Sequence, residues 1–175
     1  MPFFTVGHST RTIEEFVELL HAGDVELVID VRRVPRSRTN PQYNKDALPK
    51  NLKPFKIGYR HIAELGGLRS KPKDVSSEVN GFWENSNFHN YADYALSDDF
   101  HEGFAKLIEL GRKKRCAIMC SEAVWWRCHR RIISDYLLAH KETVFHLMGK
   151  DRVDAAKLTE GARVKSRNKV TYPLK

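Results

Sequence analysis

The sequence predicts one three-layer α/β domain, in which a mainly parallel sheet of about five strands has helices on both faces. Short apolar segments of strand length alternate along the chain with segments whose apolar residues repeat at helical spacing. A length of 175 residues and a hydrophobic content of 41% suit a single globular domain with a substantial core. We assign residues 1–149 to this domain and residues 150–175 to a basic C-terminal extension, partly ordered at most.

The N-terminal segment has the clearest strand–helix–strand pattern. Residues 3–6 form an apolar strand, and residues 25–31 form a second one that is rich in β-branched side chains. Between them, Thr12 and Glu15 have the spacing of a capping box, which predicts a helix over residues 13–21. A crossover of this kind is right-handed and joins two parallel strands.

The later elements follow from the same two periodicities and from glycine and proline positions. We expect a short helix at 45–48 interrupted by Pro49, a strand at 57–62, a partly mobile polar lid at 69–90, helices at 91–96 and 98–110 with Gly111 ending the second, a strand at 115–119, a helix at 128–140 and a last strand at 143–148.

The net charge of +8 is concentrated in the C-terminal extension, which carries eight Lys or Arg and three Asp or Glu, and therefore +5. Residues 1–149 therefore carry a net charge of only +3, so the basic isoelectric point of the whole chain does not indicate a strongly basic domain. No apolar segment approaches the length of a membrane span, and no secretory leader is visible. Three cysteines do not make a disulfide framework. We therefore expect a cytoplasmic protein with reduced thiols and no membrane partner.

A short segment near residue 120 contains every cysteine of the chain. Cys120 lies at the carboxyl end of an apolar strand, and a polar turn that includes Glu122 leads from it into a helix. Free backbone N–H groups and a helix dipole at such a turn should lower the pKa of the thiol. Cys120 is therefore a candidate nucleophile. The alternative is that it packs as a small apolar residue, as we expect for Cys116.

A basic loop follows the second strand. Asp30 lies near the end of that strand, and four arginines, including Arg32, Arg36 and Arg38, fall within the next eight residues without an acidic one. Two prolines stiffen the loop, and guanidinium groups match the oxygens of phosphate or carboxylate. The loop is therefore a candidate anion site, in which Asp30 orients an arginine or His8. The alternative is a solvated basic loop.

These segments form a series of motifs that resembles the bacterial and archaeal family catalogued as domain of unknown function 488. The motifs are Val6-Gly7-His8-Ser9-Thr10, Asp30-Val31-Arg32, Pro35-Arg36-Ser37, Leu65-Gly66-Gly67, Tyr91-Ala92, Met119-Cys120-Ser121-Glu122 and Cys128-His129-Arg130. The resemblance covers residues 3–147. It implies a compact α/β domain, but it implies no particular reaction.

Most of these motifs fall at the carboxyl end of an expected strand or in the loop after it. The carboxyl ends of parallel strands face one edge of a sheet, so we expect a single pocket there. The catalytic candidates are Cys120, Glu122, His8 and Asp30. The candidates for anion binding are Ser9, Arg32, Arg36, Arg38, Arg127, His129 and Arg130.

The leading hypothesis is an enzyme whose Cys120 thiolate attacks an anionic small molecule or nucleotide that bears phosphate, sulfur or carboxylate. The turn amides and Arg127 or Arg130 would hold the anion. Six residues separate Cys120 from Arg127, one more than in phosphatase loops, and Glu122 would repel a phosphoryl group. We therefore do not predict phosphatase activity.

The second hypothesis is a metal site. Cys120, Cys128 and His129, with His8 or Glu122, are possible ligands of zinc or iron, although the spacing matches no standard zinc motif. A related hypothesis is that Cys120 and Cys128 form a redox-active pair.

The third hypothesis is a nucleotide- or nucleic-acid-binding module without catalysis. The arginine loop and the basic tail would contact phosphates, and Trp125 and Trp126 would stack on bases. The alternative role for the tryptophans is core packing.

Overall fold

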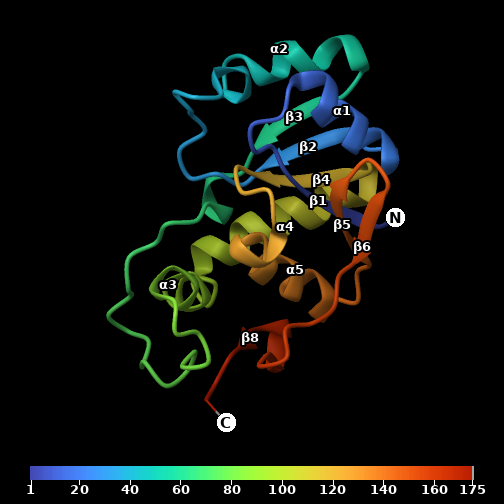
Figure 1. Cartoon of the computed structure of the whole chain (residues 1–175). Coiled ribbons are helices and arrows are strands. Elements are labelled where there is room, and N and C mark those ends of the chain that lie inside the picture. Colours follow the sequence, from blue (N-terminus) through green and yellow to red (C-terminus); the bar gives the residue numbers. More distant parts are fainter. Residues whose placement is uncertain (175) are drawn as a thin grey trace.

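The protein, described as a computed structural model for residues 1–174, is a three-layer α/β domain. Within these residues a central six-stranded sheet has the order β3-β2-β4-β1-β5-β6 (Figure 1). The first five strands in chain order are parallel, and β6 pairs antiparallel with β5. The strands are β1 (Phe3–Gly7), β2 (Leu27–Asp30), β3 (Gly58–His61), β4 (Cys116–Cys120), β5 (Val144–Gly149) and β6 (Arg152–Ala155).

Helices cover both faces of the sheet, as the sequence predicted. The helices α1 (Ile13–Ala22) and α2 (Leu48–Leu52) pack on one face, and α4 (Asp98–Lys113) and α5 (Arg130–Ala139) pack on the other, with α3 (Ser86–Tyr94) beside them (Figure 1). Short 3-10 turns are η1 (Pro41–Tyr43), η2 (Lys53–Phe55), η3 (Ala63–Leu65), η4 (Trp125–Arg127) and η5 (Ser166–Asn168). Within residues 1–174 we find no helix that is long and apolar enough to cross a membrane.

The capping box predicted at Thr12 is present. The Thr12 hydroxyl accepts a hydrogen bond from the Glu15 backbone N–H at 3.1 Å, and the Glu15 carboxylate accepts one from the Thr12 N–H at 2.9 Å. Both donors would otherwise be unpaired at the helix start. The cap fixes where α1 begins, and it thereby fixes the length of the loop that follows β1.

Three expectations about individual elements are wrong. Pro49 lies in the first turn of α2, where a missing N–H costs nothing, so it helps to begin that helix rather than interrupting a helix at 45–48. Gly111 lies inside α4, which continues to Lys113. The strand at 144–149 is not the last one, because β6 follows it after a tight turn.

The long polar segment before α3 contains no helix or strand between residues 66 and 85, and α3 begins at Ser86, five residues earlier than expected. Asn87, Phe88 and Tyr91 of α3 face the pocket described below. That this segment works as a mobile lid remains a prediction.

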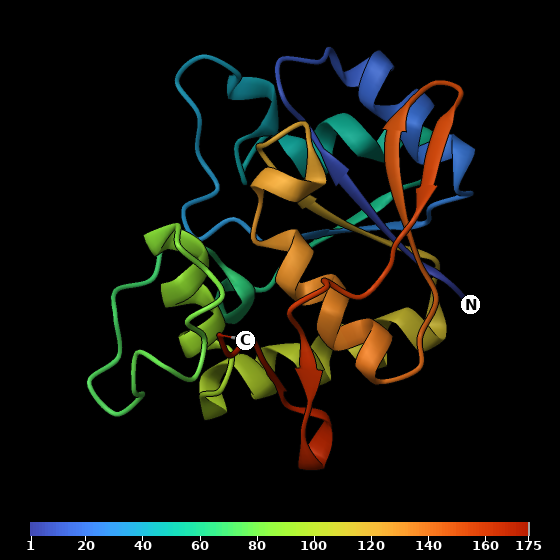
Figure 2. The same ribbon diagram turned by 60° about the horizontal axis from the view of Figure 1, so that its bottom comes forward.

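The segment after β5 returns to the body of the domain. A small hairpin of β7 (Arg163–Val164) and β8 (Val170–Thr171) follows β6, and β8 lies beside α5 (Figure 2). Tyr172 is fully buried, and its hydroxyl donates to the Asp135 carboxylate of α5 at 2.7 Å. The domain boundary at residue 149 remains a prediction.

We predict that Gly111→Ala destabilises the protein although alanine is the better helix former. A Cβ atom at Gly111 would lie 2.1 Å from the ring of Phe3, which is buried in the core. Forcing this overlap should cost about 1–3 kcal/mol, more than the helix propensity of alanine returns. Urea titration of both proteins measures the difference.

Gly149→Ala is the matched control, because no atom lies within 4 Å of a Cβ at that position. Its free energy of unfolding should be unchanged or slightly higher. Equal stability of Gly111→Ala and the unaltered chain would contradict the packing described here.

Candidate functional site

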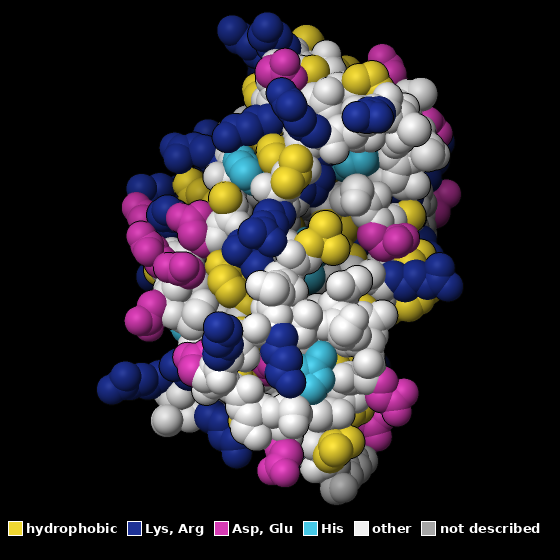
Figure 3. Space-filling view, turned by 90° about the vertical axis from the view of Figure 1, so that its left-hand side faces the viewer, with side chains coloured by type: hydrophobic (Ala, Val, Ile, Leu, Met, Phe, Trp, Pro, Cys, Tyr) yellow, Lys and Arg dark blue, Asp and Glu magenta, His cyan; other side chains and the backbone are white. Residues whose placement is uncertain are grey.

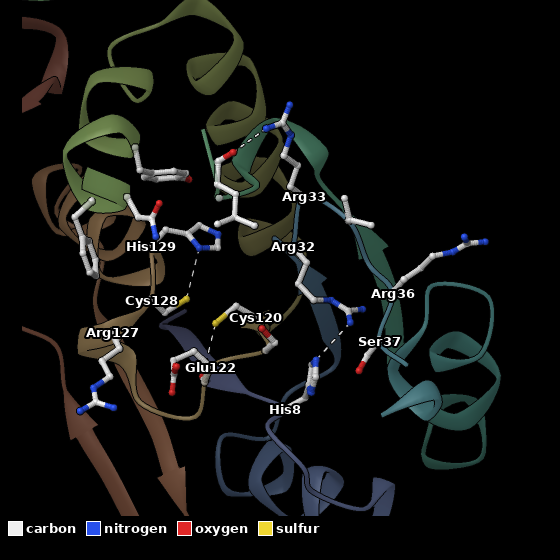
Figure 4. Close-up of a pocket in the computed structure, with 17 residues that line it drawn as sticks. His8, Arg32, Arg33, Arg36, Ser37, Cys120, Glu122, Arg127, Cys128 and His129 are labelled. Carbon is white, nitrogen blue, oxygen red and sulfur yellow. Dashed lines mark hydrogen bonds between the residues drawn. The ribbon is translucent and has the colours of Figure 1, made fainter. Parts of the chain in front are cut away.

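The carboxyl ends of β1, β2 and β4 open into one pocket of about 410 Å³ (Figure 4). The sequence predicted this convergence. The pocket is lined by His8, Arg32, Arg33, Val34, Arg36, Ser37, Gly67, Leu68, Asn87, Phe88, Tyr91, Cys120, Ser121, Glu122, Arg127, Cys128 and His129. One wall is therefore polar and basic, while α3 and the residues beside Gly67 supply an apolar and aromatic wall.

Backbone contacts hold the loops around the pocket in place. The N–H groups of His8 and Ser9 donate to the carbonyls of Cys120 and Ser121 at 2.9 and 3.0 Å, which joins the loop after β1 to the loop after β4. A Cβ atom on Gly67 would lie 2.8 Å from Nδ1 of His129. Glycine at this position therefore lets the backbone lie directly against the imidazole.

Asp30 and Arg32 form a buried ion pair at the base of the polar wall. Nε and Nη2 of Arg32 donate to the two carboxylate oxygens of Asp30 at 2.9 and 2.7 Å, and the Tyr59 hydroxyl also donates to Asp30. Asp30 is fully buried and Arg32 is 7% exposed. Asp30 thus orients an arginine, as expected, but it does not line the pocket.

His8 is held next to this pair as a neutral imidazole. Its Nδ1 lies 2.8 Å from the Ser9 carbonyl, which only accepts, so Nδ1 carries the hydrogen. Nε2 is then free to accept from Nη1 of Arg32 at 3.4 Å (Figure 4). Burial lowers the pKa of His8 to about 4, so the ring is uncharged at neutral pH.

The two cysteines of the pocket come from different elements. Cys120 ends β4, whereas Cys128 lies just before His129, the N-cap residue of α5, and both cysteines line the pocket. Cys128 Sγ accepts from the backbone N–H of Arg130 at 3.4 Å and lies 3.6 Å from Nδ1 of His129. Nε2 of His129 lies 2.8 Å from the carbonyl of Val31, so it carries a hydrogen and leaves Nδ1 as the acceptor for the thiol.

The expectation of a lowered pKa at Cys120 is wrong. Burial raises the pKa of Cys120 well above its usual value, and the neighbouring Cys128 adds to the rise. Burial also raises the pKa of Cys128, but the neighbouring Cys120 and the charge and N–H of Arg130 outweigh it and lower that pKa to about 7. Of the two thiols, that of Cys128, just before the N-cap of α5, is therefore the one that loses its proton more readily.

Arg130, which is near enough to both thiols for them to affect its pKa, has no exposed surface. Nη1 donates to the Thr5 hydroxyl at 3.1 Å and Nη2 donates to the Glu122 carbonyl at 2.7 Å, while Nε has no hydrogen-bond partner within residues 1–174. Across the same residues, no carboxylate forms an ion pair with this guanidinium. The groups that raise its pKa against the effect of burial are Cys120 and Cys128.

The remaining predicted residues fall into two groups. Arg36, Glu122 and Arg127 line the pocket but are exposed, and Arg36 and Arg127 extend away from the cysteines toward solvent (Figure 4). Ser9, Arg38 and Arg130 do not line the pocket, although Arg130 contacts it through the thiols.

The tryptophans and the alternative metal ligands are also placed. The ring of Trp125 stacks on His146 at 4.5 Å between centroids, whereas Trp126 is 41% exposed. Cys120, Cys128 and His129 do lie together, but no group of three or more His, Cys, Asp or Glu side chains arranged to hold a metal occurs within residues 1–174. A zinc or iron site remains a prediction.

The sequence analysis missed several residues that shape the site. Tyr59 contacts Asp30, and Thr5 contacts Arg130. Phe88 contributes to the apolar wall of the pocket. Thr5 is the one polar residue in an otherwise apolar strand, a signal that could have marked it. Tyr59 and Phe88 carry no such signal, because their roles depend on strand pairing and on the position of α3.

The fold and the pocket define an α/β domain with a buried two-cysteine site at the carboxyl edge of a parallel sheet. A family model described as Domain of unknown function DUF488 matches residues 12–137. The match covers more than half of the chain, so the protein belongs to this family, as the series of motifs predicted. Comparisons with curated proteins and with solved structures gave no match.

We predict that Cys128 reacts with iodoacetamide at a rate that is half-maximal near pH 7. Below this pH its thiol is protonated, and above it the reactive thiolate predominates. Cys116, whose pKa burial raises to about 12, should stay unlabelled over the same range. Peptide mass spectrometry after timed labelling between pH 5 and 9 measures both rates.

The same chain unfolded in urea is the control, because each cysteine should then titrate near its ordinary value of about 8.5. A midpoint for folded Cys128 at or above the unfolded one would contradict the charge assignment.

Proposed function

We propose that the protein is an enzyme that acts on a small anionic molecule through a cysteine thiolate, with Cys128 rather than Cys120 as the nucleophile. The observation that carries the proposal is Arg130, a fully buried guanidinium without a carboxylate partner among residues 1–174. A buried charge without a counter-ion costs several kcal/mol, on the order of 3–5, so it strongly favours a neighbouring thiolate. Arg130 thus keeps one negative charge on the cysteine pair.

His129 and the start of α5 supply the other parts of a nucleophilic site. Burial lowers the pKa of His129, so its Nδ1 is unprotonated and can accept the Cys128 proton. The Val31 carbonyl fixes the ring in this tautomer. Cys128, His129 and the Val31 carbonyl are therefore arranged as nucleophile, base and the acceptor that orients the base, as in other activated cysteine sites. The attack would form a covalent bond between Cys128 Sγ and the electrophilic atom of the substrate.

The basic wall and rim of the pocket support an anionic substrate. The exposed guanidinium groups of Arg36 and Arg127 have no ion pair within the described chain and lie at the rim. Arg32 is held rigidly below them by Asp30. Lys and Arg side chains also gather over the upper part of the surface shown in Figure 3. A cavity of about 410 Å³ suits a molecule with a small charged group.

We predict a preference of Cys128 for an anionic alkylating agent. The ratio of its reaction rate with iodoacetate to its rate with neutral iodoacetamide should be about tenfold higher than the same ratio for free cysteine. The two reagents share a leaving group, so their rate ratio reports the pocket's preference for charge. An attraction of about 1–2 kcal/mol gives this factor. Inorganic phosphate and sulfate should slow the reaction with iodoacetate, and Arg36→Ala and Arg127→Ala should lower the ratio.

Arg38→Ala is the control, because Arg38 is an exposed arginine of the same loop that does not line the pocket. A ratio equal to that of free cysteine, or one lowered as much by Arg38→Ala as by Arg36→Ala, would contradict an anion site. Failure of Cys128 to react faster than Cys116 with either reagent would refute the nucleophile.

A second candidate function is nucleotide or nucleic-acid binding without catalysis. The observation that favours it is a shallow basic groove beside the pocket, to which Arg33, Arg36, Arg38 and Lys45 contribute. Binding of a fluorescent oligothymidylate should then weaken steeply between 50 and 200 mM salt, and Arg38→Ala should weaken it as much as Arg36→Ala does. Absence of binding at 50 mM salt would remove this function.

A further inference from the structure

Cys120 has no part in the nucleophilic step proposed above, yet it lies in the same pocket as Cys128. Both cysteines line the cavity, and each contributes to the pKa shift of the other although they are eight positions apart in the chain (Figure 4). Cys116, on the same strand as Cys120, instead directs its thiol to the Lys114 carbonyl and lies outside the pocket. The fold therefore brings two of the three thiols together.

The surroundings of the pair favour negative charge on sulfur and on a departing oxygen. The Arg130 backbone N–H binds Cys128 Sγ, and the Nε–H of the same buried residue has no partner within residues 1–174. Cys120 Sγ donates to the Glu122 carbonyl at 3.7 Å, so the Cys120 thiol has an acceptor for its proton (Figure 4). One sulfur is thus prepared to attack, and the other holds a proton beside it.

We propose that Cys120 and Cys128 form a dithiol centre that reduces hydroperoxides and closes to a disulfide. This inference rests on the proposed function in one respect, namely that Cys128 is the reactive thiol. The substrate of this second activity is a molecule of the type R–O–O–H, of which hydrogen peroxide is the smallest.

The reaction balances in two steps. The Cys128 thiolate attacks the terminal peroxide oxygen, so that an S–O bond forms, the O–O bond breaks and RO⁻ leaves, taking a proton to become ROH. Cys120 then attacks the sulfur of the Cys128 sulfenic acid, so that an S–S bond forms and the hydroxyl group leaves with the Cys120 proton as water. The two thiols supply the two electrons that reduce the peroxide, and a dithiol reductant reopens the disulfide.

The test treats the full chain with one equivalent of hydrogen peroxide at pH 7 without reductant. Cleavage by trypsin after Arg115, Arg127 and Arg130 leaves Cys116 and Cys120 on one peptide and Cys128 on another. A cross-linked pair of these peptides that is two hydrogens lighter than the sum of the separate peptides supports the proposal. The same cross-link in Cys116→Ala assigns it to Cys120.

Two further variants isolate the steps. In Cys120→Ser the sulfenic acid cannot be resolved, so dimedone should label Cys128 at least tenfold more than in the unaltered chain. In Cys128→Ser peroxide consumption should fall at least tenfold. Circular dichroism of each variant shows whether it is folded, and the Cys116→Ala chain serves as the reference for a buried cysteine that takes no part.

The inference is overturned if Cys128 proceeds to sulfinic acid at the same rate with and without Cys120, or if the cross-link involves Cys116. Fast alkylation of Cys128 without any disulfide would refute the dithiol centre and leave the proposed nucleophile in place. If Cys128 reacts with neither alkylating agent nor peroxide, both proposals fail.

Discussion

The structure depends on how it accommodates a buried positive charge. Arg130 lies inside the domain, at the meeting point of β1, β4 and α5. Its guanidinium donates to a hydroxyl and a carbonyl, and the nearby thiols of Cys120 and Cys128 raise its pKa. Hydrogen bonds to neutral groups reduce the cost of burying a guanidinium but do not cancel it. The thiols are the groups within reach that can supply the missing charge. Cysteine chemistry in this protein is therefore tied to the stability of its core.

The second buried arginine shows the contrasting arrangement. Arg32 has a complete set of partners, with both oxygens of Asp30 and the Tyr43 carbonyl, and its neighbour His8 is neutral. The charge of Arg32 is already balanced by Asp30. Arg32 therefore forms a rigid part of the pocket wall but contributes little net positive potential. The two arginines lie at the same edge of the sheet. They differ because the end of β2 places the Asp30 carboxylate beside Arg32, whereas the end of β4 places the Cys120 sulfur near Arg130.

The sequence carried enough information for the layers of the fold, the parallel sheet, the capping box at Thr12 and the convergence of motifs on one edge. These follow from periodicity and from the direction of strands, which are local properties. The choice of Cys128 over Cys120 was not accessible, because it depends on the N–H of Arg130 and on burial, and both require the three-dimensional contacts. Gly111 was misread for the same reason: its place inside α4 is explained by the Phe3 ring, which is distant in sequence.

The strand order also has a consequence for how the chain folds. In the sheet β1 lies between β4 and β5, so the first strand to be synthesised has no neighbour until residues 116–149 exist. During translation, β2 and β3 can pair early, whereas the middle of the sheet must wait. Such long-range closure slows folding and leaves apolar strand edges open meanwhile. The cysteine pocket, whose lining comes from the segments after β1, β2 and β4, can therefore form only after residues 120–129 have been synthesised.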